Sequence, residues 1–298
     1  MIFDFYITLL LPYLTHIAIL VCIYVILGIS LNLAVGQTGL LNMGHVAFYG
    51  IGAYTSALLT LKGVSFAEAF LMAGIVSCLF GYLLSKPIAR LKGDYLALAT
   101  LGFNFVVYAV MLNWMGLTRG PLGLPGIPRP SFLGLTLSDN THYLIFAFVL
   151  AALVYLIVER LTNSPFGRAL AATRDDEIGA RMLGKDTRKL KTTAMLISAF
   201  FAGLAGSLYA HYINFIDPST FSISEIILIF TIVIVGGLAS NRGVIVGVLI
   251  IFLIQESLRF FGLPSSILGP ARQMIYSLVL LLIIIVRPKG ILGKVDLE

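Results

Sequence analysis

The chain has 298 residues, of which 59% are hydrophobic and only 11% are charged, and its mean hydropathy is +0.99. A soluble domain carries about 25% charged residues, so this chain has too little polar surface to cover a water-facing fold. Its apolar runs are long and continuous, which argues against a transmembrane barrel with short alternating strands. The composition therefore predicts an all-α integral membrane protein, with residues 1–298 forming a single transmembrane domain.

Nine apolar stretches approach the length of about 20 residues that a membrane-spanning helix needs. The N-terminus has neither a basic region nor a small-residue cleavage site, so it is expected to begin the first span rather than to be a signal peptide. The first stretch is long enough to contain a break and the second could be a pair of half-helices, which leaves counts of eight to ten open. The predicted spans are 7–34, 41–61, 66–85, 95–115, 143–158, 193–213, 224–239, 243–261 and 271–287.

Basic residues gather on one side of this nine-span topology. That side holds 15 of the 20 Lys and Arg residues, which makes it the cytoplasm by the positive-inside rule. The C-terminus and the loop 159–192 are therefore expected in the cytoplasm, whereas the side of the N-terminus stays open. The 15 residues are Lys86, Arg90, Lys92, Arg160, Arg168, Arg174, Arg181, Lys185, Arg188, Lys189, Lys191, Arg242, Arg287, Lys289 and Lys294.

The loop 116–142 lies on the opposite, external side and is rich in proline and glycine. Its first part, 116–134, contains four prolines and five glycines, a composition typical of a stiff, non-helical, solvated segment. Two interpretations remain: a simple connector, or a docking surface or lid over an external mouth.

The cytoplasmic loop 159–192 is predicted to contain a short capped helix. Asp175 is expected to cap it, with Asp176 and Glu177 in the first turn, where negative charge is favourable. Gly184 is a natural stop, and Asp186 or Thr187 can cap the helix that continues into the sixth span. The mixed charge of this loop favours a protein-binding element, and a solvated loop is the alternative.

Motifs for nucleotide binding, metal binding or covalent catalysis are incomplete or absent in the sequence. The stretch GARMLGKD (179–186) has Asp186 where a phosphate loop needs Ser or Thr, and it follows no predicted strand. The four histidines show no metal-ligand spacing, and there is no nucleophile elbow. The sequence therefore predicts no catalytic, cofactor or metal site in this chain, and an intramembrane enzyme is poorly supported.

Small residues recur at three- and four-residue steps on several predicted spans, as expected where membrane helices pack closely. These stripes are Ala47, Gly50, Ala53 and Ala57 on the second span, Ala199, Gly203, Ser207 and Ala210 on the sixth, and Gly243 and Gly247 on the eighth.

Polar residues inside membrane spans are costly to bury and are therefore functional candidates. Gln37 and Asn42, together with Thr38, mark a predicted break between the first two spans and can satisfy freed backbone groups. His45 is either a structural hydrogen-bonding residue or part of the pathway lining. Asn104 lies in the middle of its span and is the hardest to explain as an interfacial residue. Gln37, Asn42, His45 and Asn104 are thus the pathway candidates.

The two halves of the chain also resemble each other in outline. Each has a long span, a polar loop that could cap the next helix, and then a further span; the loops are QTGLLNMG (37–44) and PSTFSISE (218–225). With nine spans, the first runs inward and the sixth outward, so the halves would form an inverted repeat, which is typical of transporters.

Several stretches together carry a resemblance to a known family that spans nearly the whole chain in order. The sequence is similar to the permease subunits of branched-chain amino-acid ABC transporters, of the LivM type. The stretches are GQTGLLNMGHVAFYGIGAYTSALL (36–59), GDYLALATLGFN (93–104), TRGPLGLPGIP (118–128), RALAATRDDEIGARMLGKDTRKLK (168–191), AFFAGLAGSLYA (199–210) and IVGGLASNRGVIVG (234–247).

The resemblance implies a multi-pass permease of a bacterial or archaeal inner membrane that imports branched-chain (hydrophobic) amino acids; urea, short-chain amides and other amino acids, which related systems carry, are the alternative solutes. It implies a second permease as partner, two cytoplasmic ATPase subunits that bind ATP and Mg²⁺, and a periplasmic or extracellular substrate-binding protein facing the loop 116–142. A stand-alone secondary transporter or channel is the alternative. The coupling loop of the family falls on 171–191 here, and the residues expected to contact the ATPase are Arg174, Asp175, Asp176, Glu177, Gly184 and Lys185.

Overall fold

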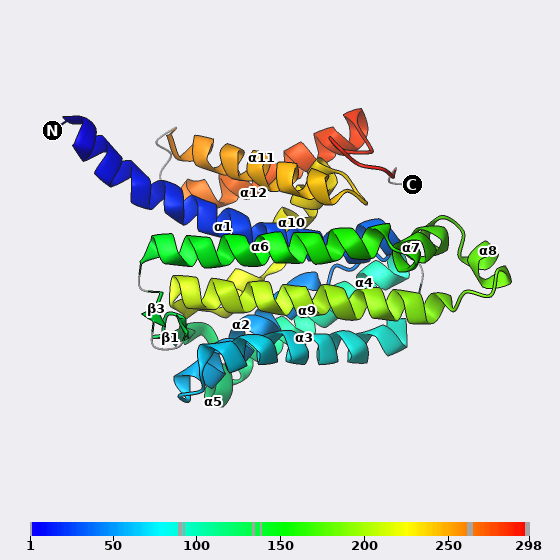
Figure 1. The fold of residues 1–298 in the computed structure, drawn as a ribbon, viewed down its shortest axis with the longest axis horizontal. Helices are drawn as coiled ribbons and strands as arrows, with labels where there is room; N and C mark the ends of the chain where they lie inside the picture. The colour runs from blue at the N-terminus through cyan, green and yellow to red at the C-terminus, as the bar shows by residue number, and fades with distance from the viewer. Residues whose placement is uncertain are drawn as a thin grey trace.

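The computed structural model describes residues 2–88, 91, 93–132, 135–137, 139–260 and 265–295. Long antiparallel helices form a bundle, with short helices and two small two-stranded sheets at its ends (Figure 1). The all-α prediction is therefore confirmed. The helices are α1 (Ile2–Thr38), α2 (His45–Leu61), α3 (Phe66–Ile88), α4 (Gly93–Asn113), α5 (Met115–Thr118), α6 (Asn140–Asn163), α7 (Pro165–Asp175), α8 (Glu177–Met182), α9 (Thr187–Ile213), α10 (Ile223–Gly236), α11 (Asn241–Phe260) and α12 (Ser265–Val286).

Seven helices of the described chain are long and apolar enough to cross a membrane. The second and seventh predicted spans are instead the short helices α2, with 17 residues, and α10, with 14. At 1.5 Å per residue such helices reach roughly 21–26 Å, less than the hydrocarbon thickness of about 30 Å. The non-helical residues in front of each must supply the remaining depth, so the count of nine spans stays a prediction.

The two short helices each follow a break in the chain, and the breaks lie at opposite ends of the bundle. Residues 39–44 connect α1 to α2 at the end that carries α7 and α8 (Figure 1). Residues 214–222 connect α9 to α10 at the other end and include β4 (Phe215–Ile216) and the 3₁₀ helix η2 (Pro218–Phe221). This placement agrees with an inverted repeat.

The predicted external loop has more structure than its composition indicated. It contains the helical turns α5 and η1 (Gly120–Leu122), so the expectation of a wholly non-helical segment is wrong. Its strand β1 (Leu124–Pro125) pairs with β4 at the second break, while β2 (Ser131–Phe132) pairs with β3 (Leu135–Thr136). Residues 133, 134 and 138 of this loop lie outside the described residues. Two of the predicted cytoplasmic cations in another loop, Arg90 and Lys92, also lie outside them. The loop is therefore attached to the break rather than standing free in solvent.

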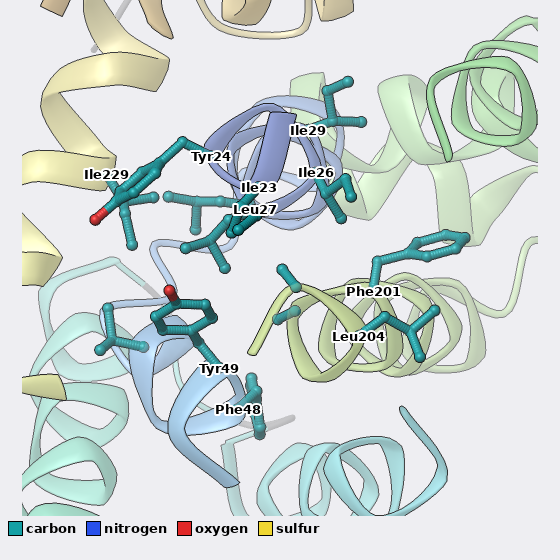
Figure 2. Close-up of a cluster of buried hydrophobic side chains, with 14 of the residues drawn as sticks. Ile23, Tyr24, Ile26, Leu27, Ile29, Phe48, Tyr49, Phe201, Leu204 and Ile229 are labelled. Atoms are coloured by element: carbon teal, nitrogen blue, oxygen red, sulfur yellow. The ribbon is translucent and has the colours of Figure 1, made fainter. Parts of the chain in front are cut away.

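Helices α1 and α9 form the centre of the bundle. In the apolar 18-residue segment of each helix, 78% of the residues of α1 and 72% of those of α9 are buried. In the corresponding segment of α12 only 6% are buried, so α12 lies on the periphery. Large aliphatic side chains of α1, such as Ile23 and Leu27, fill the space between α2, α9 and α10 (Figure 2). Because α9 is surrounded by neighbours, its small residues are needed on more than one face.

Glycine allows the backbones of α2, α3 and α9 to touch. A Cβ atom at Gly52 would lie 2.6 Å from the carbonyl carbon of Gly203, and one at Gly203 would lie 2.6 Å from the carbonyl oxygen of Ala73. Gly50, in the predicted stripe, faces the side chains of Met111 and Phe221 instead of a helix backbone. The close contact on α2 is thus made by a glycine that the stripe did not include.

The predicted glycine pair on α11 does mediate helix packing. Gly243 lies against the backbone of Gly236, and Gly247 lies against Ile232 and Gly236 of α10. This close approach lets α10 and α11 form a tight antiparallel pair.

Candidate functional site

The break after α1 is held by the polar residues that the sequence predicted there. Thr38 Oγ1 accepts from the amide of Leu40 at 3.3 Å, and Asn42 Oδ1 accepts from the amide of Gly44 at 3.1 Å. Gly39 adopts φ +69°, which reverses the chain direction at a conformation few other residues tolerate. Freed backbone groups are thus satisfied locally, as membrane depth demands.

The expectation that the two polar loops cap α2 and α10 is wrong. The N-cap residues are Gly44 and Ser222, and neither makes a side-chain hydrogen bond to its helix. Asn42 instead bonds the amide of Gly44 itself, and its Nδ2 lies 3.3 Å from the sulfur of Met195 on α9. Asn42 therefore ties the break to α9 rather than starting α2.

Gln37 and Asn32 hold a second turn far away in sequence. Gln37 Nε2 donates to the carbonyl of Ala239 at 3.2 Å, and Asn32 Oδ1 accepts from the amide of Ala239 at 2.9 Å. Ala239 is a non-glycine residue at φ +60° in the turn between α10 and α11. Two side chains of α1 thus satisfy both backbone groups of a strained residue, and this links the first break to the second half of the chain.

His45 is enclosed between α1 and α9. Its ring is 1% exposed, Nε2 lies 2.9 Å from Ser30 Oγ, and Nδ1 lies 3.5 Å from Ser198 Oγ. Ser198 also donates to the carbonyl of Ser30 at 2.6 Å. This environment supports the structural interpretation of His45 over the pathway-lining one.

Replacing His45 by alanine should lower the free energy of unfolding by about 1–3 kcal/mol, because buried serine hydroxyls lose a partner. Thermal unfolding of the purified chain in detergent measures this. His142→Ala is the control, because His142 has a side chain that is 64% exposed. If His45→Ala unfolds like the control but loses transport, the pathway-lining role is the correct one.

Asn104 lies on α4 beside the same break. It is 2% exposed, and its Oδ1 has no hydrogen-bond partner among the described residues. One turn earlier on α4, Thr100 Oγ1 accepts from the amide of Met43 at 3.0 Å. Asn104 is thus brought next to the break, and its unpartnered buried oxygen keeps it a pathway candidate.

The loop 159–192, predicted to be cytoplasmic, contains two helices, α7 and α8, instead of the single helix that was predicted. Asp175 does not cap a helix; it is the last residue of α7 and pairs with Arg174 Nε at 2.8 Å. The cap of α8 is Asp176, whose Oδ1 accepts from the amides of Ile178 and Gly179, both at 3.0 Å. Asp176 takes this role because the chain leaves helical geometry there, at φ −150°.

The other caps are confirmed. Gly184 stands at φ +75° after Leu183, and its amide donates to the carbonyl of Arg181 at 2.9 Å. Asp186 caps α9 by accepting from the amide of Lys189 at 3.1 Å. The backbone of Lys185 bonds to Ala180 at 3.1 Å while its side chain faces solvent.

Glu177 joins α8 to the start of α9. Its carboxylate accepts from Arg181 Nη2 at 2.5 Å, from Lys191 Nζ at 2.9 Å and from Thr187 Oγ1 at 3.2 Å. Partial burial raises the pKa of Glu177, but the hydrogen bond and charge of Lys191 and the charge of Arg181 lower it by more, so the pKa lies below its ordinary value. The ionised carboxylate therefore stabilises the α8–α9 junction.

This junction should loosen in acid. A carboxyl group whose pKa is lowered on folding contributes stability above its ordinary pKa, and this stability is lost as the pH falls through the folded value. Amide exchange at the start of α9, corrected for intrinsic rates, should be protected at pH 7 and 5.5 and should accelerate below about pH 4.5. Glu177→Gln should abolish this acceleration of amide exchange at low pH. An unchanged acceleration in that variant would assign the effect to another titrating group.

Sequence reasoning missed the apolar surface of α8. Ile178, Met182 and Leu183 are 62%, 83% and 80% exposed, on a loop that carries charged residues on either side. Apolar side chains this exposed on a capped helix are typical of a protein contact. The sequence carries a signal for this surface, because these apolar residues stand between charged ones. The pattern of helix caps alone does not reveal it.

A direct hydrogen bond joins the cytoplasmic loop to the break. Arg174 Nη1 donates to the carbonyl of Gly36 at 2.9 Å, and a Cβ atom at Gly39 would lie 3.1 Å from Arg174 Cγ. The Arg174 side chain is 16% exposed, so this contact is largely shielded from water. The structure thus connects two groups of predicted site residues, the cytoplasmic loop and the first break.

Known proteins resemble this chain over most of its length. The high-affinity branched-chain amino acid transport permease LivM of Escherichia coli K12 is 37% identical to this chain, over 93% of this chain and 69% of the relative. A probable LivM permease of Methanocaldococcus jannaschii is 28% identical over 91% of both chains, and the LivH permease of Salmonella typhimurium is 25% identical over 92% of both. No solved structure matches the chain significantly.

The same assignment follows from a family profile. Residues 13–286 match the family described as the branched-chain amino acid transport system / permease component, which covers all helices from α2 to α12 and most of α1. The relatives are transport permeases and not enzymes. This chain, a multi-pass membrane protein, therefore belongs to the family of branched-chain amino acid transport permeases.

Proposed function

We propose that this chain is the membrane-spanning permease subunit of an ATP-driven importer for branched-chain amino acids. In this proposal it forms the translocation pathway with a second permease, α8 docks on cytoplasmic ATPase subunits, and the loop 116–142 receives an external substrate-binding protein. The C-terminus lies in the cytoplasm, and the end of the bundle that carries α7 and α8 faces the ATPases. The names LivM and LivH belong to distinct permeases, which supports pairing of two such chains.

The strongest support is the family match over residues 13–286 and the LivM relative at 37% identity. Within the structure, the hydrogen bond from Arg174 to Gly36 offers a route for coupling. An ATPase that moves α8 would pull on α7, and Arg174 would transmit that motion to the end of α1. The break at 39–44 and its partner turn at Ala239 would then shift together, because Gln37 connects them. A gated pathway needs such a link between its energy source and its non-helical segments.

A stand-alone secondary transporter is a weaker candidate because it needs coupling groups within this chain. The described helices place two glutamates where they could serve, and both already accept hydrogen bonds: Glu225 from Tyr24 at 2.6 Å, and Glu256 from Tyr13. These contacts give each carboxylate a role in holding α10 or α11 against α1.

Reconstitution in liposomes tests the proposal. Radiolabelled leucine should accumulate only when this chain, a second permease, the ATPases, the binding protein and ATP are all present. Omission of each component should abolish uptake. Leucine uptake by this chain alone, driven by a proton or sodium gradient, would overturn the proposal in favour of secondary transport.

A further inference from the structure

A polar cavity of about 410 Å³ opens at the end of the bundle that carries α7. It lies between the C-terminal ends of α1 and α6, one face of α7 from Gly167 to Arg174, residues 239–242 and the C-terminal tail. Four cations line it, and we name it the basic cavity after Arg168, Arg174, Arg242 and Lys294.

The charge of the basic cavity is not balanced by the described residues around it. Glu159 is the one carboxylate among its described lining residues, and it offsets only one of the four positive charges; Asn241 Nδ2 donates to it at 2.8 Å and Asn163 Nδ2 at 3.3 Å. Arg174 is paired with Asp175. In the described part of the chain, the side chains of Arg242 and Lys294 make no hydrogen bond or ion pair.

Arg168 completes a convergent set of donors. Its Nη1 makes a weak contact of 3.4 Å to the carbonyl of Asn163, which leaves the other guanidinium donors available. A general excess of cytoplasmic cations would explain scattered positive charge. It does not explain why cations from α7, α11 and the tail converge on one hollow.

An apolar groove of about 390 Å³ runs along the outer face of α6 toward the same end of the bundle. It is lined by Phe148, Leu153, Leu156 and neighbouring residues, and it ends at Arg160. The next residue along the chain toward the N-terminus, Glu159, lines the basic cavity. Asn163, one turn beyond Arg160 on α6, also lines the basic cavity. The apolar groove and the basic cavity therefore lie one helical turn apart at the C-terminal end of α6.

We infer that this chain binds an anionic phospholipid, with its phosphate headgroup in the basic cavity and an acyl chain along the groove on α6. Guanidinium groups donate to phosphate in a bidentate manner, and basic hollows between helices at the cytoplasmic surface suit anionic headgroups. The lipid would contact Arg174, which bonds Gly36, so its binding would stabilise the junction between the cytoplasmic loop and the first break.

Native mass spectrometry of the purified full-length chain tests this inference, with phosphatidylglycerol and phosphatidylcholine of identical acyl chains titrated in separate arms. The wild type should bind phosphatidylglycerol more tightly. Arg168→Gln/Arg242→Gln should weaken phosphatidylglycerol about 30-fold, since each basic residue near an anionic lipid surface is worth a factor of about five, and should leave phosphatidylcholine unchanged. Lys86→Gln/Lys189→Gln removes the same charge at the same end, outside the cavity, and should change affinity less than twofold.

A second variant guards against misfolding. Arg242→Gln/Lys294→Gln alters two exposed side chains and should weaken phosphatidylglycerol similarly, with an unchanged unfolding temperature. Leu153→Ala/Leu156→Ala should weaken both lipids through the groove. Equal binding of both lipids by the wild type, or equal phosphatidylglycerol binding by all charge variants, would overturn the inference. Saturable binding of glycerol 3-phosphate as tight as that of the lipid would overturn the role of the groove.

Discussion

Replacing Gly206 by alanine is expected to destabilise the protein by about 3 kcal/mol, a fall of roughly 10 °C in unfolding temperature. Gly206 lies on α9 where this helix crosses α2. A Cβ atom there would overlap the carbonyl oxygen of Tyr49 and lie 2.8 Å from the amide nitrogen of Ala53. Both obstacles are backbone atoms of a central helix, so no side-chain rotation relieves the clash. Thermal unfolding of the purified chain in detergent measures the effect.

Gly102→Ala on α4 is the matched control. It makes the same change within a long membrane helix, and a Cβ atom there would meet nothing within 4 Å. Helix propensity alone favours alanine over glycine by about 0.5–1 kcal/mol, so Gly102→Ala should be neutral or slightly stabilising. Equal unfolding temperatures for the two variants would show that α2 and α9 are farther apart than in this structure. Gly206→Val should reduce the amount of folded protein in the membrane further.

Small-residue periodicity predicts that a helix packs closely, but not which of its faces does so. The stripe on α9 contained Gly203 and Ser207, and both are buried. Gly206, next to them in sequence, points in another direction: a Cβ atom at Gly206 would meet the backbone of α2, whereas one at Gly203 would meet α3. A single stripe assumes one neighbour, whereas α9 packs against α1, α2 and α3 at once. A helix that is buried on all sides needs small residues on several faces. A search for small residues along a single face cannot reveal those on the other faces.

Local signals predicted the cytoplasmic loop better than they predicted the break. Gly184 and Asp186 perform the expected roles because a cap depends on residues three or four positions away. The cap of α8 was misplaced by one residue, since Asp175 and Asp176 are equivalent by local preference and the end of α7 decides between them.

The contacts of Gln37 depend on tertiary structure and have no local signal. Gln37 and Ala239 are 202 residues apart, and their pairing requires the turn between α10 and α11 to lie beside the end of α1. The same holds for Arg174 and Gly36, which are 138 residues apart. Sequence reasoning recognised the polar residues as costly in a membrane, but only the packing of the two halves identifies their partners.

These long-range contacts suggest why the break contains polar side chains instead of a plain glycine turn. Asn42 holds the break, and Asn32 and Gln37 hold the turn at Ala239, through directed hydrogen bonds that can be exchanged when neighbouring helices shift. Apolar packing alone would leave the freed backbone groups unsatisfied in a membrane. The break is thus stable as it stands and remains connected to α7 through Arg174.

The largest functional effect is expected from the exposed apolar face of α8. Ile178→Asp/Met182→Asp should abolish ATP-driven leucine uptake in the reconstituted transporter and prevent co-purification of the ATPases. Burying a side chain of this size contributes about 1.5–3 kcal/mol, so losing two of them and burying charge instead should weaken docking at least about 100-fold. Met182 is 83% exposed in the free chain, so the unfolding temperature of the isolated permease should stay unchanged.

Two controls separate docking from charge and from folding. Met182→Leu keeps an apolar side chain of similar size and should retain uptake, whereas Ala172→Asp places one of the two added negative charges on an exposed position of α7 and should reduce uptake far less. Pull-down of the ATPase subunits with each variant, beside its unfolding temperature, distinguishes the cases. Full ATPase association and uptake by Ile178→Asp/Met182→Asp would show that the cytoplasmic loop couples through its charged residues. Glu177 and Lys185 would then be the next positions to exchange.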